Sequence, residues 1–311
     1  ILTCNLTTVS LTAVCSPPNA QFFWIGPTGT LTGNPIQATS PGTFTVTATN
    51  SSNGCVSAIS INVTQNIVSP SITTSISNDS INCLTPTISL GVNTSNVNTV
   101  CSWSGPSGFT SSVQNPPPVN NPGIYVVTIT DTINGCSSTD TLQIYTGPDP
   151  TVSFVATPTA GVIPLDVTFT NTSMPGFSSY TWSYGDGNGS IGQNGFNTYY
   201  IQGSYTAQLI GVSSNGLCND TADVIIIVYP PAELSIPNIF SPNGDGINEF
   251  FQVESKGLKD IYIQIFDRWG LRVATIDGFN GYWDGVNAAE GTYYYVARAE
   301  GYDGKIIDRQ G

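Results

Sequence analysis

The sequence has no histidine among its 311 residues. Histidine is the usual general base near neutral pH, the commonest metal ligand and the base of Ser-His and Cys-His nucleophile pairs, so these arrangements are excluded. The sequence also has no P-loop and no Cys-x-x-Cys pair. Two carboxylates could still serve a glycosidase, but a chain of small domains leaves no module of catalytic size. We therefore expect no enzymatic activity and no cofactor.

Positive charge is absent from most of the chain. All seven Lys and Arg residues lie after residue 255, and the formal net charge is −13. Nucleic-acid binding needs Lys or Arg to replace the counterions of the phosphates, so a nucleic-acid partner is excluded. The C-terminal part, which contains all the Lys and Arg, is therefore a different module from the first 255 residues.

Long apolar runs are absent as well, and no stretch reaches the roughly 20 residues of a membrane-spanning helix. Charged residues make up only 9% of the chain, against about 25% in an average protein, while it contains 32 Gly and 21 Pro. This composition favours turns and strands. We expect an all-β protein with three or four small domains and no membrane span.

Three tryptophans reveal an internal repeat, because Trp24, Trp103 and Trp182 are spaced by 79 and again by 79 residues. Each is followed by a strand of alternating pattern, such as TFTVTAT at 43–49, and then by an Asn-Gly turn signal. A Trp on a central strand and turns about every ten residues are typical of an immunoglobulin-like β-sandwich. We expect all three tryptophans to lie in sandwich cores.

The third repeat contains WSYGDGNGS at 182–190, preceded by DVTFTNTS and followed by GSYTAQL. It resembles the PKD domain, which implies an extracellular spacer. Proline-containing connections near 67–71, 146–150 and 228–237 then predict the domain boundaries. The predicted domains are an Ig-like sandwich at 1–66, a second at 67–147, a PKD-like sandwich at 148–230 and a fourth β-sandwich at 231–311.

The fourth module contains IPNIFSPNGDGINEFF at 236–251, followed by IYIQIFDRWG, YWDG and GTYYYV. It resembles the C-terminal sorting domain of gliding-motility-associated proteins from Bacteroidetes, the type B signal of the type 9 secretion system. Within this resemblance, Asp267 to Gly270 is expected to be a hairpin turn and Trp283 a core residue.

The resemblance implies export across the outer membrane of a Gram-negative bacterium to the cell surface. It also implies recognition by the type 9 translocon and by a SprF-like outer-membrane protein. The motif residues expected to carry this recognition are Pro237, Asn238, Phe240, Pro242, Asn243, Gly244, Asp245, Gly246, Asn248, Arg268, Trp269 and Gly270.

The NGDGIN stretch of this motif allows three interpretations: a calcium loop, a structural turn or a surface read by a receptor. As an EF-type loop it would start at Ser241 and use Asn243 and Asp245, but the first position lacks its acid and the twelfth is Gln252. One carboxylate is too few for calcium, so we expect no metal. The turn and the receptor surface are compatible with each other.

Two disulfides are expected, between Cys4 and Cys55 and between Cys83 and Cys136, because these cysteines superpose in the first two repeats. Each would close a loop of about 50 residues and contribute roughly 4 kcal/mol of stability. The other three cysteines have no counterparts and are interpreted as buried free thiols: Cys15, Cys101 and Cys218.

Four sites resemble the Asp-Ser/Thr-apolar signal for O-glycosylation in Bacteroidetes. The predicted acceptors are Ser80, Thr132, Thr141 and Thr221.

The last segment, GKIIDRQG, ends where members of the sorting-domain family usually continue into one more apolar strand. The fourth module is therefore expected to lack its last strand and to leave the preceding strand unpaired. Either the sequence simply ends early, or a strand from another chain completes the edge.

These observations favour a non-catalytic surface adhesin or stalk of the gliding-motility type, exported by type 9 secretion. Two alternatives stay open at this point. One is a self-assembling extracellular filament subunit that pairs through sheet edges, and the other is the accessory part of a secreted polysaccharide-degrading enzyme.

Overall fold

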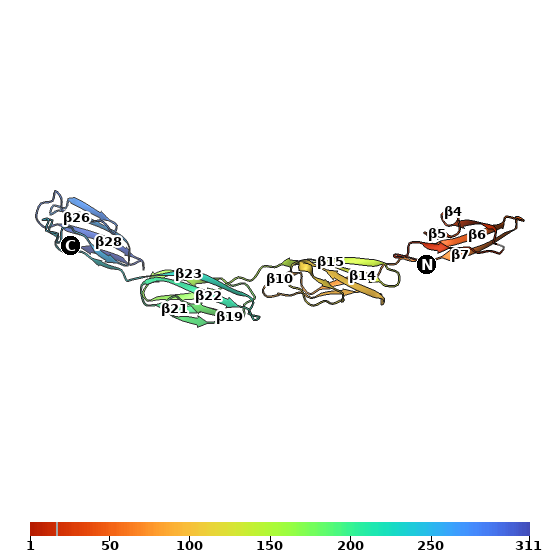
Figure 1. Ribbon diagram of the computed structural model, residues 1–311. Helices are drawn as coiled ribbons and strands as arrows, with labels where there is room; N and C mark the ends of the chain where they lie inside the picture. The colour runs from red at the N-terminus through yellow and green to blue at the C-terminus, as the bar shows by residue number, and fades with distance from the viewer. Residues whose placement is uncertain (17) are drawn as a thin grey trace. The chain divides into compact units, whose positions relative to one another are not determined.

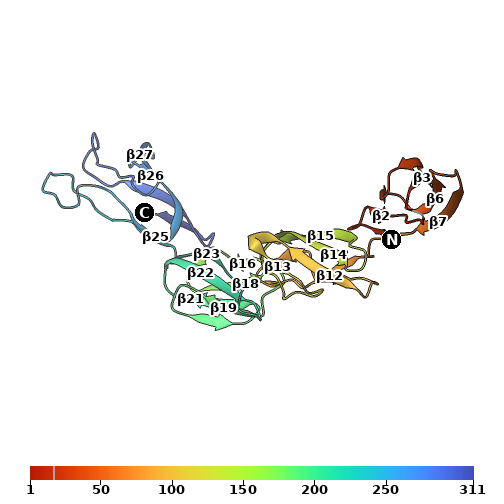
Figure 2. The same ribbon diagram turned by 45° about the vertical axis from the view of Figure 1, so that its right-hand side comes forward.

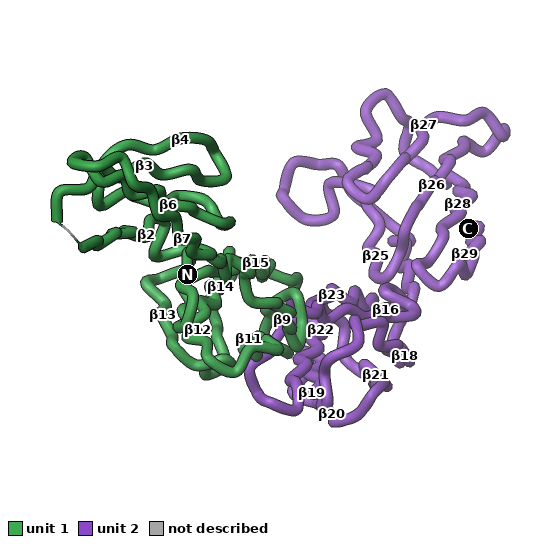
Figure 3. Tube along the Cα trace, turned by 90° about the vertical axis from the view of Figure 1, so that its right-hand side faces the viewer, with its two compact units in different colours: residues 1–148 green, residues 149–311 purple. Residues whose placement is uncertain are grey.

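The computed structural model describes residues 1–16 and 18–311. In the described part of the chain the elements are β-strands, apart from the 3-10 helix η1 (Pro106–Gly108). The chain divides into two compact units, Ile1–Pro148 and Asp149–Gly311 (Figure 3). Each unit contains two hydrophobic cores, and each core lies within one of the four predicted domain ranges. The boundaries at 66, 147 and 230 stay predictions.

The first sandwich has a four-stranded sheet of order β4-β3-β6-β7, a pair β2-β5 and a parallel pair β1-β8. Its strands are β1 (Leu2–Thr3), β2 (Val9–Leu11), β3 (Ala20–Gly26), β4 (Gly29–Thr32), β5 (Ile36–Ala38), β6 (Gly42–Asn50), β7 (Val56–Val63) and β8 (Gln65–Asn66).

The second sandwich has a five-stranded sheet of order β10-β15-β14-β12-β13 and a pair β11-β9. Strands β12 to β15 lie side by side in Figure 2. The strands are β9 (Thr73–Ile76), β10 (Ser80–Ile81), β11 (Leu90–Asn93), β12 (Thr99–Ser104), β13 (Thr110–Ser111), β14 (Gly123–Asp131) and β15 (Ser137–Thr146).

The third sandwich packs a five-stranded sheet, β17-β23-β22-β19-β20, against a three-stranded one, β16-β18-β21 (Figure 1). Its strands are β16 (Phe154–Thr157), β17 (Ala160–Val162), β18 (Leu165–Asn171), β19 (Ser179–Ser183), β20 (Gly189–Ile191), β21 (Gly195–Tyr199), β22 (Gly203–Val212) and β23 (Asn219–Tyr229).

The three repeat tryptophans are buried in three separate cores, as predicted. Each lies on the strand that pairs with the long alternating strand of its repeat, and the partners are Val46, Val127 and Leu209. The indole Nε1 of Trp103 donates to the carbonyl of Val113 at 3.1 Å, and that of Trp182 donates to the carbonyl of Gly192 at 3.1 Å. The buried Nε1 of Trp24 has no acceptor among the described residues.

The fourth module has a four-stranded sheet of order β27-β26-β28-β29 and a two-stranded pair β24-β25. The hairpin between β26 and β27 turns at Asp267–Gly270, as expected, and Trp283 lies in the core. The strands are β24 (Glu233–Ser235), β25 (Glu254–Lys256), β26 (Leu258–Phe266), β27 (Arg272–Asp277), β28 (Tyr294–Gly301) and β29 (Ile306–Gln310).

The expectation of a missing last strand is wrong. The segment GKIIDRQG itself forms β29, which pairs antiparallel with β28 from Val296↔Gln310 to Glu300↔Ile306. The chain reverses because Gly304 adopts a positive φ of 74° and the Asp303 carboxylate accepts the Lys305 N–H at 3.0 Å. Since the chain's own strand covers the edge of β28, strand donation to that edge is wrong as well.

Candidate partner-binding groove in residues 231–311

The NGDGIN stretch forms an exposed loop that is held by its own hydrogen bonds. Gly244 and Gly246 have positive φ values of 79° and 82°, which L side chains rarely adopt. Their backbone N–H groups donate to the two carboxylate oxygens of Glu249, at 3.0 and 2.9 Å. Ser241 N–H donates to the carbonyl of Asn248 at 2.7 Å and closes the loop. The stretch is therefore a structural turn that is stabilised by its own hydrogen bonds.

The acidic side chains of this loop already accept hydrogen bonds from inside it. The Asn243 side-chain amide donates to Asp245 at 2.9 Å and the Ile247 N–H donates to it at 2.8 Å, and in this order they lower the pKa of the Asp245 carboxyl. Calcium prefers six to eight oxygen ligands. Across residues 1–16 and 18–311 no cluster of three or more His, Cys, Asp or Glu could hold a metal ion.

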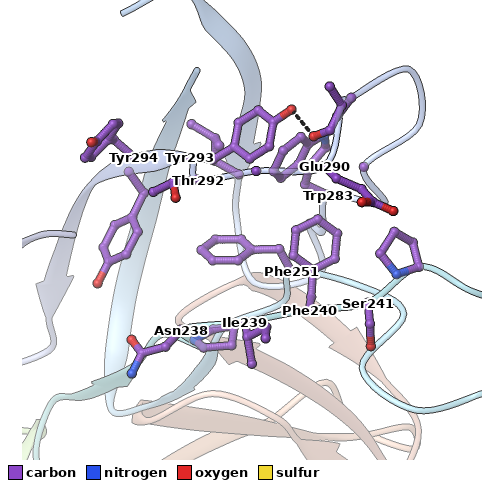
Figure 4. Close-up of a pocket in the computed structure, with 18 of the residues that line it drawn as sticks. Asn238, Ile239, Phe240, Ser241, Phe251, Trp283, Glu290, Thr292, Tyr293 and Tyr294 are labelled. Atoms are coloured by element: carbon purple, nitrogen blue, oxygen red, sulfur yellow. Dashed lines mark hydrogen bonds between the residues drawn. The ribbon is translucent and has the colours of Figure 1, made fainter. Parts of the chain in front are cut away.

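A groove of about 910 Å³ lies beside this loop in the fourth module (Figure 4). Two irregular segments, 237–243 and 285–295, supply most of its lining, and Phe251, Ile265, Trp283 and Gly311 supply the rest. Neither segment is a strand over most of its length, so the side chains are positioned by packing against the sheet. Phe251 and Trp283 form an isolated antiparallel bridge, with N–H···O distances of 2.8 and 3.1 Å, that ties the two sides together.

The groove is built of aromatic rings. The ring centroids of Phe240 and Trp283 are 5.2 Å apart, those of Trp283 and Tyr293 are 4.9 Å apart, and those of Phe251 and Tyr295 are 5.9 Å apart. Figure 4 shows Phe240, Phe251, Trp283 and Tyr293 gathered around one space. Tilted and edge-to-face contacts of this kind add stability beyond the area they bury. The groove therefore has a rigid apolar floor.

Tyr293 fixes the segment that forms one wall of the groove. Its hydroxyl donates to the carbonyl of Ala289, four residues earlier, at 2.7 Å. Tyr125 and Tyr205 make the same contact with Asn121 and Ile201 in the second and third sandwiches. This is the tyrosine-corner arrangement of immunoglobulin-like folds. The tyrosine corner that recurs in the sandwiches thus also positions one wall of the groove.

Apolar side chains of the groove are open to solvent. The exposed fractions of Ile239 and Tyr294 are 78% and 53%. Trp269, at the tip of the β26–β27 hairpin, is 82% exposed, and the Arg268 guanidinium lies over its ring at 5.1 Å. A Cβ at Gly291 of the groove wall would contact Arg268, so this hairpin borders the groove. The arrangement suits an apolar partner segment with polar contacts at the rim.

The predicted recognition residues fall into three groups. Pro237, Asn238, Phe240, Pro242 and Asn243 line the groove. Gly244, Asp245, Gly246 and Asn248 form the neighbouring loop, and Arg268, Trp269 and Gly270 form the bordering turn. The sequence motif did not single out Ile239, Glu290, Thr292, Tyr294 and Tyr295, which line the groove too. Their recognition role stays a prediction.

The predicted disulfide pairing is wrong. Cys4 is bonded to Cys136, across the first two sandwiches, with a Cα–Cα distance of 5.1 Å. Cys55 is an exposed free thiol. The pairing differs because Cys4 lies beside the turn of the second sandwich, and its N–H donates to the carbonyl of Asn134 at 3.0 Å. Superposing the repeats identified equivalent cysteines but not the neighbours that each one meets.

The other cysteines differ from one another. Cys101 is a buried free thiol, as predicted, and burial raises its pKa. Cys83 is disulfide-bonded. Cys218 is disulfide-bonded too, so its interpretation as a free thiol is wrong. Cys15 is half-buried beside Cys55.

The four predicted glycosylation residues lie in different settings, and three of them are exposed. Thr141 and Thr221 are exposed on β15 and β23, and Ser80 is half-buried on β10. Thr132 is exposed in a turn, where its hydroxyl donates to the carbonyl of Asn98 at 3.1 Å. Their modification stays a prediction.

Comparison with known families identifies two modules. Residues 234–309 match the CHU_C type IX secretion signal domain, and residues 147–228 match the PKD domain. The chain carries a type IX secretion signal. The signal domain and the tandem sandwiches make it a secreted, extracellular repeat protein that the type IX secretion machinery handles. Both matched families are non-catalytic domain types. In the described residues no helix is long and apolar enough to cross a membrane.

Several solved structures are similar to parts of the chain. One is the PKD1 domain of the Vibrio cholerae metalloprotease PrtV, at 30% identity over 26% of this chain and 98% of that chain, with a TM-score of 0.23. Another is a tetra-tandem repeat in the extending region of a large adhesion protein, at 16% identity over 98% of this chain and 94% of that chain, with a TM-score of 0.30. The three N-terminal domains of the bacteriophage RB49 outer capsid protein Hoc are 13% identical over 78% of this chain and 96% of that chain, with a TM-score of 0.36. No curated protein matches the chain.

Proposed function

We propose that the chain is the export-directing end of a non-catalytic adhesin or stalk of the gliding-motility type on the surface of a Gram-negative bacterium. Its modules are 1–66, 67–147, 148–230 and 231–311. The signal domain directs export, and the three sandwiches project from it as a spacer. The type 9 translocon and a SprF-like outer-membrane protein are the proposed partners of the signal domain.

One observation carries this proposal: the residues of the secretion motif line or border a single groove with an aromatic floor. Five of the motif residues line it, and the exposed side chains of Ile239 and Tyr294 stand at its opening. Aromatic and aliphatic side chains at the centre of a pocket commonly dominate the energy of a protein interface. We propose that an apolar segment of the secretion partner enters this groove, with Arg268 and Trp269 at the rim.

The composition of the first 255 residues supports the spacer role. They contain no Lys or Arg, so proteases that cleave after these residues have no target there. Among the described cysteines, the bridge between Cys4 and Cys136 fastens consecutive sandwiches to each other in an oxidising environment. Donation of a foreign strand to β28 is not proposed, since β29 already pairs with that strand.

The test is export of groove variants from a bacterium with a working type 9 system. We expect Ile239→Asp and Tyr294→Asp to abolish release, because a carboxylate in the groove would be desolvated by an apolar partner. Surface display would be measured by protease shaving of intact cells and by immunoblotting of the periplasm, where the retained protein would accumulate.

The matched control is Ile191→Asp on β20 of the third sandwich, where the side chain is 83% exposed and far along the chain from the signal domain. It should be exported like the unchanged protein. If the two groove variants reach the surface as efficiently as Ile191→Asp while remaining folded by circular dichroism, the groove is not the recognition site.

A further inference from the structure

The turn at residues 131–136 of the second sandwich binds the first sandwich. The Asn134 side-chain amide donates to Asn66 Oδ1 at 3.1 Å and to the Val68 carbonyl at 2.9 Å, while the Asn134 carbonyl accepts the Cys4 N–H at 3.0 Å. Cys136 then closes the contact through its disulfide to Cys4. Only 2% of Asn134 and 1% of Cys136 remain exposed.

The glycine of this turn takes part in the contact as well. Gly135 has a φ of 70°, and a Cβ placed on it would overlap the side chain of Asn5. The turn thus binds two segments of the first sandwich, the residues around Cys4 and the exit strand around Asn66. Backbone, side-chain and covalent contacts all contribute.

The first sandwich contains a second copy of the same turn at residues 50–55. The Asn50 N–H donates to the Cys55 carbonyl at 2.9 Å, and the Gly54 N–H donates to the Asn50 carbonyl at 2.8 Å. The corresponding distances from Asp131 to Cys136 and from Gly135 to Asp131 are 2.9 and 2.8 Å. The two turns have the same internal geometry.

The copy in the first sandwich is uncovered. Asn53 and Cys55 are exposed, the Cys55 thiol is free, and a Cβ on Gly54 would meet nothing within 4 Å. The sequence keeps Asn, Gly and Cys at all three positions that make the contact in the second sandwich. A shallow hollow of about 210 Å³ lies beside Cys55.

We propose that residues 50–55 dock a further sandwich of the same kind, joined on the amino-terminal side of this one in the same polypeptide. Its segment equivalent to residues 2–5 lies across the turn, and its cysteine is bonded to Cys55. The occupant is a consecutive sandwich because Asn134 binds the linker residues Asn66 and Val68, which only a directly connected neighbour supplies. The bond between Cys4 and Cys136 is the observed instance of this arrangement, from the first segment of one sandwich to the Asn-Gly-Cys turn of the next.

The covalent step is a two-electron oxidation. A bond forms between the two Sγ atoms, each thiol loses its proton, and two electrons pass to a disulfide oxidant that is reduced to two thiols. Small-molecule disulfides such as oxidised glutathione supply this oxidant in the test below.

The test adds the missing neighbour to the full chain. Cys4 and Cys83 are 79 residues apart, so a second copy of residues 1–79 fused ahead of Ile1 reproduces the natural linker between the copies. After oxidation with a glutathione redox buffer, non-reducing proteolysis and mass spectrometry should find the added Cys4 linked to Cys55. Cys55 should at the same time lose its reactivity toward iodoacetamide. The Cys4–Cys136 peptide in the same digest reports that the sandwiches have folded.

The controls separate docking from random oxidation. Replacing the added Cys4 by serine should restore alkylation at Cys55, and Asn53→Ala should lower the yield of the new bridge while leaving Cys4–Cys136 unchanged. A bridge from Cys55 to Cys15, a dimer of the original chain linked through Cys55, or a Cys55 that stays alkylatable in the extended protein would each overturn the proposal.

Discussion

The first and second sandwiches are built on one sequence pattern but differ in what surrounds their Asn-Gly-Cys turns. In the second sandwich the turn is covered by its neighbour, and Asn134 and Cys136 are buried. In the first, Asn53 and Cys55 are exposed, although the hydrogen bonds within the turn are the same. The conformation of the turn is therefore local, whereas its burial and its disulfide depend on an adjacent repeat.

The cores of the first and second sandwiches also differ, in the hydrogen bonding of their tryptophans. Trp103 donates its indole N–H to Val113, while the indole N–H of Trp24 is buried without an acceptor among the described residues. A buried donor that is left unpaired costs about 1–3 kcal/mol. Among the described residues, the first sandwich thus leaves the indole N–H of Trp24 without an acceptor in its core and the side chains of Asn53 and Cys55 exposed at its turn.

The largest effect should come from removing the bridge. In the double variant Cys4→Ser/Cys136→Ser, the free energy of unfolding of the amino-terminal unit should fall by about 5 kcal/mol, because the closed loop spans 132 residues. Cys55→Ser should leave it unchanged. Urea denaturation followed by tryptophan fluorescence measures the free energy of unfolding of both variants. Equal midpoints for the double variant and Cys55→Ser would show that the covered turn and the exposed turn do not differ in stability.

A smaller effect is expected at the turn asparagines. Asn134→Ala removes two donated hydrogen bonds and the acceptor of the Cys136 N–H, in a buried site, and should cost about 2–3 kcal/mol. Asn53→Ala removes only the exposed acceptor of the Cys55 N–H and should cost less than about 1 kcal/mol. Hydrogen exchange of the amides at 55 and 136 provides a local readout of each change.

The tryptophans should show a difference of about 1 kcal/mol. Both Trp→Phe changes remove ring volume, but Trp103→Phe also takes the indole donor from the Val113 carbonyl, whereas Trp24→Phe removes an N–H that had no acceptor. Trp103→Phe should therefore be the more destabilising of the two in chemical denaturation. A larger cost for Trp24→Phe would show that the indole of Trp24 is satisfied in solution.

The smallest effect is an acid sensitivity that the second turn has and the first turn lacks. The N–H of Ile133, at 2.8 Å, is the main cause that lowers the pKa of the Asp131 carboxyl in the folded protein. Its stabilisation is complete above the unfolded pKa of about 3.9 and is lost as the pH falls through the lower folded pKa. Asn50, at the same place in the first turn, does not titrate. Asp131→Asn should flatten the dependence of the thermal midpoint on pH between pH 5 and pH 2 (roughly the range in which the carboxyl titrates), and an unchanged slope would rule out this carboxyl as its source.

Much of the fold follows from local sequence. The tryptophan spacing, the alternation of Phe44 and Val46 in β6 and the Asn-Gly turns predict buried tryptophans and half-buried strands, and the structure has both. The secretion motif likewise predicts the segment that lines the groove. These features depend on residues that are close together in the chain or in one sheet.

Two of the features that sequence reasoning missed depend on contacts between distant segments. The bond between Cys4 and Cys136 joins two repeats, so comparing each repeat with itself could not reveal it. Tyr294 enters the groove because the bridge between Phe251 and Trp283 brings its segment alongside residues 237–243. The last strand was missed because the Asp303–Gly304 turn was not recognised as the reversal that returns the chain to β28. A pair of turn residues before an apolar run is the signal that could have found it.

The bond between Cys4 and Cys136 also has a mechanical consequence. Under a tensile force on both ends of the chain, the sulfur atoms would hold Cys4 and Cys136 together, so residues 5–135 could not be extended between these two cysteines. Fully extended, those residues would add roughly 430 Å of length. While the bond is intact, this length cannot be drawn out between the two cysteines, so the linked pair of sandwiches lengthens less under load than two unlinked sandwiches would.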